Sequence, residues 1–229
     1  MTDSVAPQPP KTENELLERA GQLTGNTLRH LSELLNVDTP ENPVKAKGWI
    51  GECVELFLGA TAGPLPEPDF REIGVELKTL PLNSSHRPKE STYVCTVPLV
   101  NLSTLNWENS TVKKKLNRVL WVPVEADNDI PFAERRFGNA FLWSPDSEQI
   151  HELKSDWEEI MEMISTGELH RITSDYGKVL QIRPKGMNSK ALTRSVMETG
   201  ESGLTLPRGF YLRTSFTNEI LVRSEEKRQ

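Results

Sequence analysis

Two long apolar runs, STYVCTVPLV (residues 91–100) and RVLWVPVEA (118–126), restrict most strongly what this chain can fold into. Both are rich in β-branched and aromatic residues, which favour strands. Because neither run alternates cleanly between polar and apolar residues, both are expected as central strands that are buried on two faces. Segments with helical periodicity lie between the strands, so the sequence predicts an α/β fold in which helices flank a mixed sheet.

The remaining elements follow from periodicity and from glycine and proline punctuation. Thr12 and Glu15 have the spacing of a capping box and predict a helix start. Further helices are expected over 28–35, from about 49 to 58, over 150–164 and over 189–199, and shorter strands over 74–80, 137–145, 178–184 and 208–216. The chain is interpreted as one domain, residues 12–222, between a disordered tail (1–11) and a flexible charged tail (223–229).

Composition excludes several classes of protein. Of the 229 residues, 36% are hydrophobic and 26% charged, as in an ordinary globular protein. No apolar run reaches the ~18 residues of a membrane span, and the start MTDSVAPQPPKTE lacks the features of a secretory signal. Two cysteines, Cys53 and Cys95, are too few for a disulfide framework. We therefore expect a cytoplasmic protein with reduced, buried cysteines and no membrane partner.

Charge is segregated along the chain, although the net charge is only −6. Residues 146–168 carry eight acids and one base, whereas residues 171–213 carry eight bases and three acids. A further basic cluster, Lys113, Lys114 and Lys115 with Arg118, precedes the second apolar run. Each block is compatible with a solvated helix face, but phosphate binding also needs only local positive charge.

The segment PDFREIGVELKTL (68–80) carries the most specific chemistry. Period-two alternation places Glu76 and Lys78 on one face of a strand, and Asp69 stands at the entry to that strand. Two carboxylates and a lysine could hold Mg²⁺ and orient a water for phosphodiester hydrolysis. An acid and a lysine two residues apart on a strand are also common as an exposed ion pair, so the spacing alone leaves both readings open.

A third acid favours the metal-site reading. Glu55 lies in an otherwise apolar helical segment, ECVELFLGA, where an unpaired carboxylate would be unfavourable to bury, and Glu52 is expected to face solvent. Other chemistries have little support. The four histidines are scattered without zinc-ligand spacing, and no serine nucleophile motif or phosphate-binding glycine loop occurs.

The pattern PD…ELK resembles the signature of the type II restriction endonuclease fold. The blocks around it extend this similarity from about residue 13 to about residue 221, and they resemble the MutH family, the strand-specific endonucleases of methyl-directed mismatch repair. These blocks are KGWIGECVELFLGA, PDFREIGVELKTLPL, VKKKLNRVLWVPVE, LQIRPKG and LPRGFYL. The resemblance implies two lobes around a DNA-binding cleft, with the loop over 59–68 as a candidate hinge.

The resemblance also implies roles for the acids and the lysine. Asp69 and Glu76 would be the ligands of Mg²⁺, Lys78 the catalytic lysine, and Glu55 a supporting acid from the neighbouring helix. The number of metal ions is left open.

For DNA, the resemblance implies recognition of GATC and nicking of the unmethylated strand on the 5′ side of the G. Lys47 and Lys115 would approach the scissile phosphate or its neighbours, and Arg183 and Lys185 would make base and phosphate contacts. Tyr211 would lie near the adenine methyl group and reject it sterically. Without the resemblance, a tyrosine in an alternating strand is most often packing.

The resemblance further implies a monomer that MutL activates after MutS finds a mismatch. The acidic block over 146–168 would keep one surface soluble or form part of a docking surface. Three alternatives stay open from the sequence: a restriction-type endonuclease that cuts both strands at GATC, a DNA-binding module without catalysis, and a structural protein with a surface ion pair.

Overall fold

The computed structural model describes residues 7–40, 48–63, 65–185, 192–196 and 199–227. The chain divides into two compact units. Unit 1 comprises residues 1–90, 117–144 and 222–229, and unit 2 comprises residues 91–116 and 145–221. The candidate hinge, 59–68, lies inside unit 1, whereas the chain passes from one unit to the other after residues 90, 116, 144 and 221.

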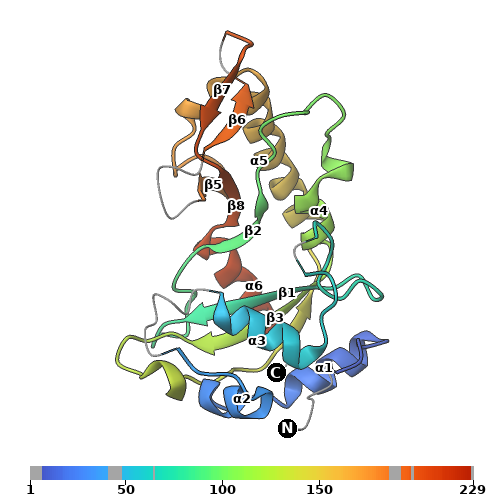
Figure 1. Ribbon diagram of the computed structural model, residues 1–229, viewed down its shortest axis with the longest axis vertical. Coiled ribbons are helices and arrows are strands. Elements are labelled where there is room, and N and C mark those ends of the chain that lie inside the picture. The colour runs from blue at the N-terminus through green and yellow to red at the C-terminus, as the bar shows by residue number, and fades with distance from the viewer. Residues whose placement is uncertain (1–6, 41–47, 64, 186–191, 197–198, 228–229) are drawn as a thin grey trace. The chain divides into compact units, whose positions relative to one another are not determined.

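A three-stranded sheet forms the centre of unit 1. Its strands are β1 (Glu76–Leu82), β3 (Val119–Glu125) and β4 (Phe141–Trp143), in the order β1-β3-β4 (Figure 1). β1 and β3 are parallel and β4 is antiparallel to β3, so the predicted mixed sheet is confirmed. Six of the seven residues of β3 are buried, as its continuous apolar run predicts.

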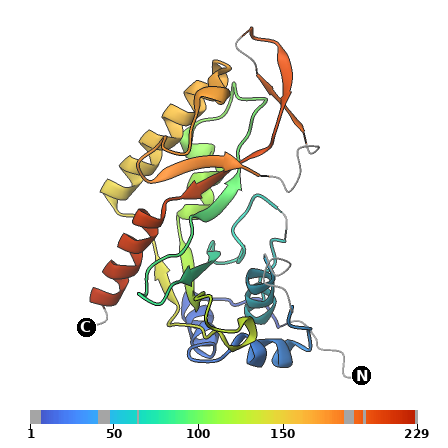
Figure 2. The same ribbon diagram turned by 90° about the vertical axis from the view of Figure 1, so that its left-hand side faces the viewer.

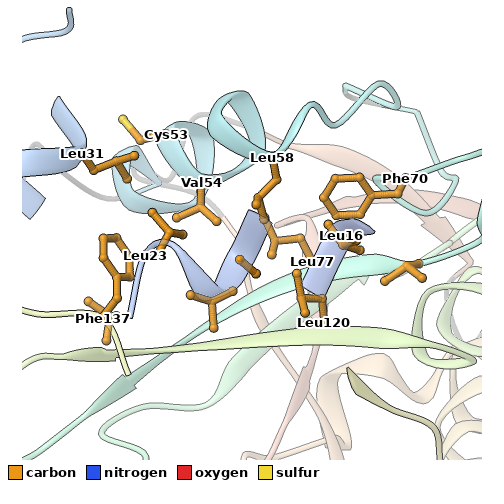
Figure 3. Close-up of a cluster of buried hydrophobic side chains, with 14 of the residues drawn as sticks. Leu16, Leu23, Leu31, Cys53, Val54, Leu58, Phe70, Leu77, Leu120 and Phe137 are labelled. Atoms are coloured by element: carbon orange, nitrogen blue, oxygen red, sulfur yellow. The ribbon is translucent and has the colours of Figure 1, made fainter. Parts of the chain in front are cut away.

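Three helices pack on this sheet: α1 (Glu13–Gly21), α2 (Leu28–Leu35) and α3 (Trp49–Leu58). Thr12 caps α1, because its side chain accepts a hydrogen bond from the Glu15 amide. The reciprocal half of the predicted capping box is not formed, since the Glu15 carboxylate accepts from the amide of Lys11 instead, at 2.8 Å. The helices meet the sheet in one apolar cluster, in which Leu16, Val54 and Leu58 lie against Leu77 and Leu120 (Figure 3). This cluster fixes α3 and β1, the two elements that carry Glu55 and Glu76.

Unit 2 contains a second three-stranded sheet of order β2-β8-β5, which is antiparallel throughout. Its strands are β2 (Thr92–Thr96), β5 (Leu180–Pro184) and β8 (Arg208–Leu212). The long helix α5 (Ser147–Ser165), gold in Figure 2, runs along this sheet. Trp157 of α5 and Phe210 of β8 line the same apolar cavity. The helix therefore covers the sheet face that carries Phe210.

Further helical elements connect and follow these strands. They are α4 (Thr111–Leu116), α6 (Thr214–Glu226) and three single turns of 3-10 helix, η1 (Trp107–Asn109), η2 (Phe132–Glu134) and η3 (Glu168–Arg171). Both cysteines are buried, as expected, and they are not bonded to each other. Across the described residues, no helix is both long enough and apolar enough to cross a membrane.

The helix expected over 189–199 is wrong. Residues 193–196 form strand β6 (Thr193–Val196), which pairs antiparallel with β7 (Ser202–Thr205), a strand that the sequence did not predict. Gly200, with φ of +79°, lies in the turn between the two strands. The β-branched ends of β6 favour this pairing over a helix.

Described residues of both predicted tails belong to a helix or make contacts. Helix α6 continues to Glu226, so residues 223–226, which were assigned to a flexible tail, are helical. At the other end, Arg19 donates a hydrogen bond of 2.6 Å to the carbonyl oxygen of Gln8, and Pro10 is buried. These contacts connect residues 8–10 to unit 1.

Candidate functional site

Asp69 is fixed by hydrogen bonds at the entry to β1. Its backbone carbonyl accepts hydrogen bonds from the amides of Thr61 and Ala62, at 2.9 and 3.3 Å. Its side-chain Oδ2 accepts one from the amide of Leu77, at 2.8 Å. The carboxylate is only 8% exposed. Asp69 is therefore held against the strand that carries the next acid.

Glu76 and Lys78 form a buried ion pair on β1. The Glu76 side chain is 1% exposed and that of Lys78 is 13% exposed, and Nζ of Lys78 donates to Oε1 of Glu76. Alternation along the strand puts both side chains on one face, as predicted. The alternative of an exposed surface pair is wrong, because both side chains are largely removed from water. Burying an ion pair is unfavourable unless further groups compensate it.

Glu55 of α3 lies within the electrostatic influence of this pair. Burial, followed by the neighbouring charges of Asp69 and Glu76, raises the pKa of its carboxyl from 4.5 to about 7, although Lys78 acts in the opposite direction. Glu52, one turn earlier, is exposed as expected. Three carboxyl groups and one lysine therefore gather in unit 1, which agrees with the predicted grouping.

The donor set fits a divalent cation with oxygen ligands. Within the described ranges, no three acidic, histidine or cysteine side chains surround one point closely enough to hold a metal by themselves. Asp69 and Glu76 would therefore supply two protein ligands, and water would complete the shell, an arrangement that Mg²⁺ commonly accepts. Burial is the main cause of the raised pKa of Glu55, and the charges of Asp69 and Glu76 add to it, so a cation bound here would offset part of the shift.

The predicted DNA-reading residues belong to one face of the sheet in unit 2. Tyr211 of β8 is paired with Gln181 of β5, and Gly209 with Arg183, so these four positions share a face. Arg183 is exposed and Gln181 is buried, with the Arg183 Nη2 3.5 Å from the Gln181 Oε1. Lys185 follows directly after β5 and is exposed.

A β-bulge adds two residues that the sequence analysis missed. The pairing of β2 with β8 shifts between Tyr93 and Cys95, so that Tyr93 opposes Tyr211 and Thr96 opposes Gly209. Residues three apart on a regular strand point to opposite faces, but the extra residue of a bulge brings Tyr93 and Thr96 to the same one. No local sequence signal marks this bulge.

The other two predicted DNA contacts are placed differently. Lys115 is half-buried in the short helix α4 of unit 2, and Lys47 lies outside the described residues. Asp69, Glu76, Lys78 and Glu55 thus belong to unit 1, and Lys115, Arg183, Lys185 and Tyr211 to unit 2.

Comparison with known proteins gives one consistent result. The family described as "DNA mismatch repair enzyme MutH" matches residues 58–156. The chain is 53% identical over 215 residues to the DNA mismatch repair protein MutH of Escherichia coli strain K12, covering 94% of each chain. It has the same identity and coverage with the proteins of that name from strains O6:K15:H31 and O9:H4.

Proposed function

Since the chain belongs to the MutH family of DNA mismatch repair endonucleases, we propose that it nicks the unmethylated strand of hemimethylated GATC sites. The cut falls on the 5′ side of the G and requires Mg²⁺. The observation that carries this proposal is the buried group of Asp69, Glu76 and Lys78 with Glu55 beside it. A group of three acids and a lysine contributes little to a purely structural role, since burying charges opposes folding.

Each residue of the acidic site has a proposed task. Asp69 and Glu76 hold the cation, which when bound activates water and stabilises the charge of the phosphate. Lys78 orients the attacking water through its ammonium, which lies on the face of β1 that carries Glu76. To take the proton of that water, the Lys78 amine must first have released one of its own. The Asp69–Leu77 hydrogen bond keeps the first carboxylate in place. Glu55 supports the site from α3.

DNA recognition is assigned to the basic residues and to Tyr211. Arg183 is suited to read guanine, because a guanidinium can bond O6 and N7 in the major groove together. Lys185, Lys115 and Lys47 contact phosphates or bases, and the ring of Tyr211 rejects the methyl group of a methylated adenine. The partners are duplex DNA and the activator MutL, with MutS acting upstream. The enzyme acts as a monomer in the cytoplasm.

A nicking assay tests the proposal directly. Purified protein is incubated with Mg²⁺ and a duplex that holds one GATC site, methylated on neither, one or both strands, with and without MutL. We expect a nick 5′ of the G in the unmethylated strand only, enhanced by MutL. Lys78→Ala should reduce the rate by at least about a hundredfold, the scale of losing a positioned catalytic group.

Lys154→Ala is the matched control, since this lysine lies on α5 and its 3.8 Å ion pair with Glu158 is exposed. It should nick at the wild-type rate. Cutting of both strands without MutL would assign the protein to the restriction class instead. Binding to GATC without nicking under any condition would indicate a module that has lost catalysis, and the acidic site would then need another explanation.

A further inference from the structure

Lys185, which follows β5, is held in place by two hydroxyl groups of β2, the strand on the other side of β8. Its Nζ donates hydrogen bonds to the hydroxyls of Tyr93 and of Thr96, the latter at 3.2 Å. The two hydroxyls are themselves hydrogen-bonded at 3.1 Å. The ammonium also lies over the Tyr93 ring, 4.3 Å from its centroid, a cation–π geometry. An exposed lysine ordinarily samples many rotamers, so these contacts preorganise its charge.

The same tyrosine contacts Tyr211. The two rings meet edge to face, with centroids 5.4 Å apart and planes at 64°. Beneath them lies Gly209, where an added Cβ would come within 2.9 Å of Cε2 of both rings. Both rings therefore lie close over a strand position that has no side chain. Tyr211 is confined from the side by Tyr93 and from below by the backbone of β8.

We infer that Tyr93 is a positioning residue for strand discrimination, because its ring fixes the orientation of Tyr211 and its hydroxyl fixes Lys185. The inference rests on the proposed function, in which Tyr211 rejects the adenine methyl group. Steric rejection of one methyl requires a ring that cannot turn away, since a mobile side chain would yield to so small a group. Tyr93 and the bare Gly209 together remove this freedom.

Two substitutions at position 93 separate the two tasks. Tyr93→Ala removes the ring, so the preference for the unmethylated strand should fall roughly two- to tenfold, the range that an edge-to-face pair contributes. Tyr93→Phe keeps the ring and removes only the hydroxyl. It should retain the strand preference but raise KM for the GATC duplex by about threefold or more with kcat unchanged, because the hydroxyl loses its hydrogen bonds to Lys185 and Thr96 while the ring stays in place.

Gly209→Ala tests the same idea without touching either tyrosine. No left-handed φ is required at this position, so alanine is compatible with the backbone, but its Cβ must displace both rings. We expect the same loss of strand preference as for Tyr93→Ala. Gly21→Ala is the matched control, since nothing lies within 4 Å of the added Cβ. Tyr176→Ala controls for the loss of an aromatic residue, because Tyr176 lies on neither β2 nor β8.

The decisive readout is the ratio of nicking rates on the two strands, measured on hemimethylated duplexes of both orientations. A purely structural role of Tyr93 would lower both rates equally, and an unchanged ratio in Tyr93→Ala and Gly209→Ala would overturn the inference. Wild-type protein in the same assay distinguishes a failure of the proposed nicking function from a failure of the positioning role of Tyr93. If it fails to nick or shows no preference, the proposed function fails and this inference falls with it.

Discussion

At the scale of single residues, Glu55 is the group whose surroundings most alter its chemistry. Burial, with Asp69 and Glu76 nearby, raises its pKa to about 7. An acid with a raised pKa in the folded state favours folding while both states are protonated. That stability is lost as pH rises, because the unfolded chain ionises first, from about 4.5.

We therefore predict a pH-dependent difference between the wild type and Glu55→Gln without metal. Glutamine imitates the protonated acid, so the two proteins should unfold at similar temperatures near pH 4. Between the unfolded pKa of 4.5 and the folded value of about 7, the wild type should become progressively less stable than the variant, and the gap should then level off. Thermal unfolding in chelator from pH 4 to 8 measures this, and a gap independent of pH would contradict it.

At the same scale, sequence reasoning found some residues of the site and missed others. Glu76 and Lys78 could be assigned to one face because strand alternation is local. Tyr93 and Thr96 could not be placed beside Lys185, because a bulge and an antiparallel partner far along the chain decide where they point. The close approach of two rings to Gly209 is likewise invisible in the sequence.

At the scale of elements, a single carboxylate joins α5 to the start of β5. Asp156, 6% exposed on α5, accepts hydrogen bonds from the amides of Lys178, Val179 and Leu180, at 2.9, 2.7 and 2.8 Å. Gly177, with φ of +81°, allows the turn, and a Cβ there would lie 1.9 Å from the carbonyl oxygen of Leu180. The strand that carries Arg183 is positioned by this attachment.

Asp156→Ala should therefore lower the free energy of unfolding by about 3 kcal/mol or more, since buried amides would lose a charged acceptor. Asp156→Asn keeps one carbonyl oxygen and should lose less. Urea denaturation of both variants measures the loss, with Glu159→Ala, an exposed neighbour on α5, as the control. Equal stability of Asp156→Ala and the control would show that water replaces these bonds at no cost.

The same scale contains the clearest error of the sequence analysis. Residues 193–196 lie in a stretch whose composition suits a helix, yet they form β6 because β7 pairs with it. Pairing with a neighbouring strand overrides a weak local preference, since helix propensities differ by less than about 1 kcal/mol per residue for most residue types.

At the scale of the whole molecule, part of the acidic block and part of the basic block of the sequence lie on opposite faces of the sheet in unit 2. The acidic helix α5 covers the sheet face of Phe210, and the basic residues Arg183 and Lys185 accompany Tyr211 on the other. A protein with a net charge of −6 can therefore still present a basic surface to phosphate.

This arrangement predicts how salt affects DNA binding. The logarithm of the affinity should fall linearly with the logarithm of the salt concentration, with a slope of about −0.9 for each phosphate contacted. Lys115→Ala should flatten the slope by about that amount. Glu162→Gln, at an exposed position of α5, is the control and should leave it unchanged. Titrations of a GATC duplex at several salt concentrations measure this slope. An unaltered slope in Lys115→Ala would show that this lysine does not contact a phosphate.

The amino-acid sequence predicted the family, most of the strands and helices, and a group of acids and a lysine carried by α3, β1 and the entry to β1. These features are local, because side-chain periodicity and motif spacing depend only on near neighbours in the chain. The tertiary structure decided that Glu76 and Lys78 are buried, that Asp69 bonds to Leu77, and that Tyr93 reaches Lys185 and Tyr211. Burial and strand register depend on segments distant in the chain, whose pairing local periodicity does not specify.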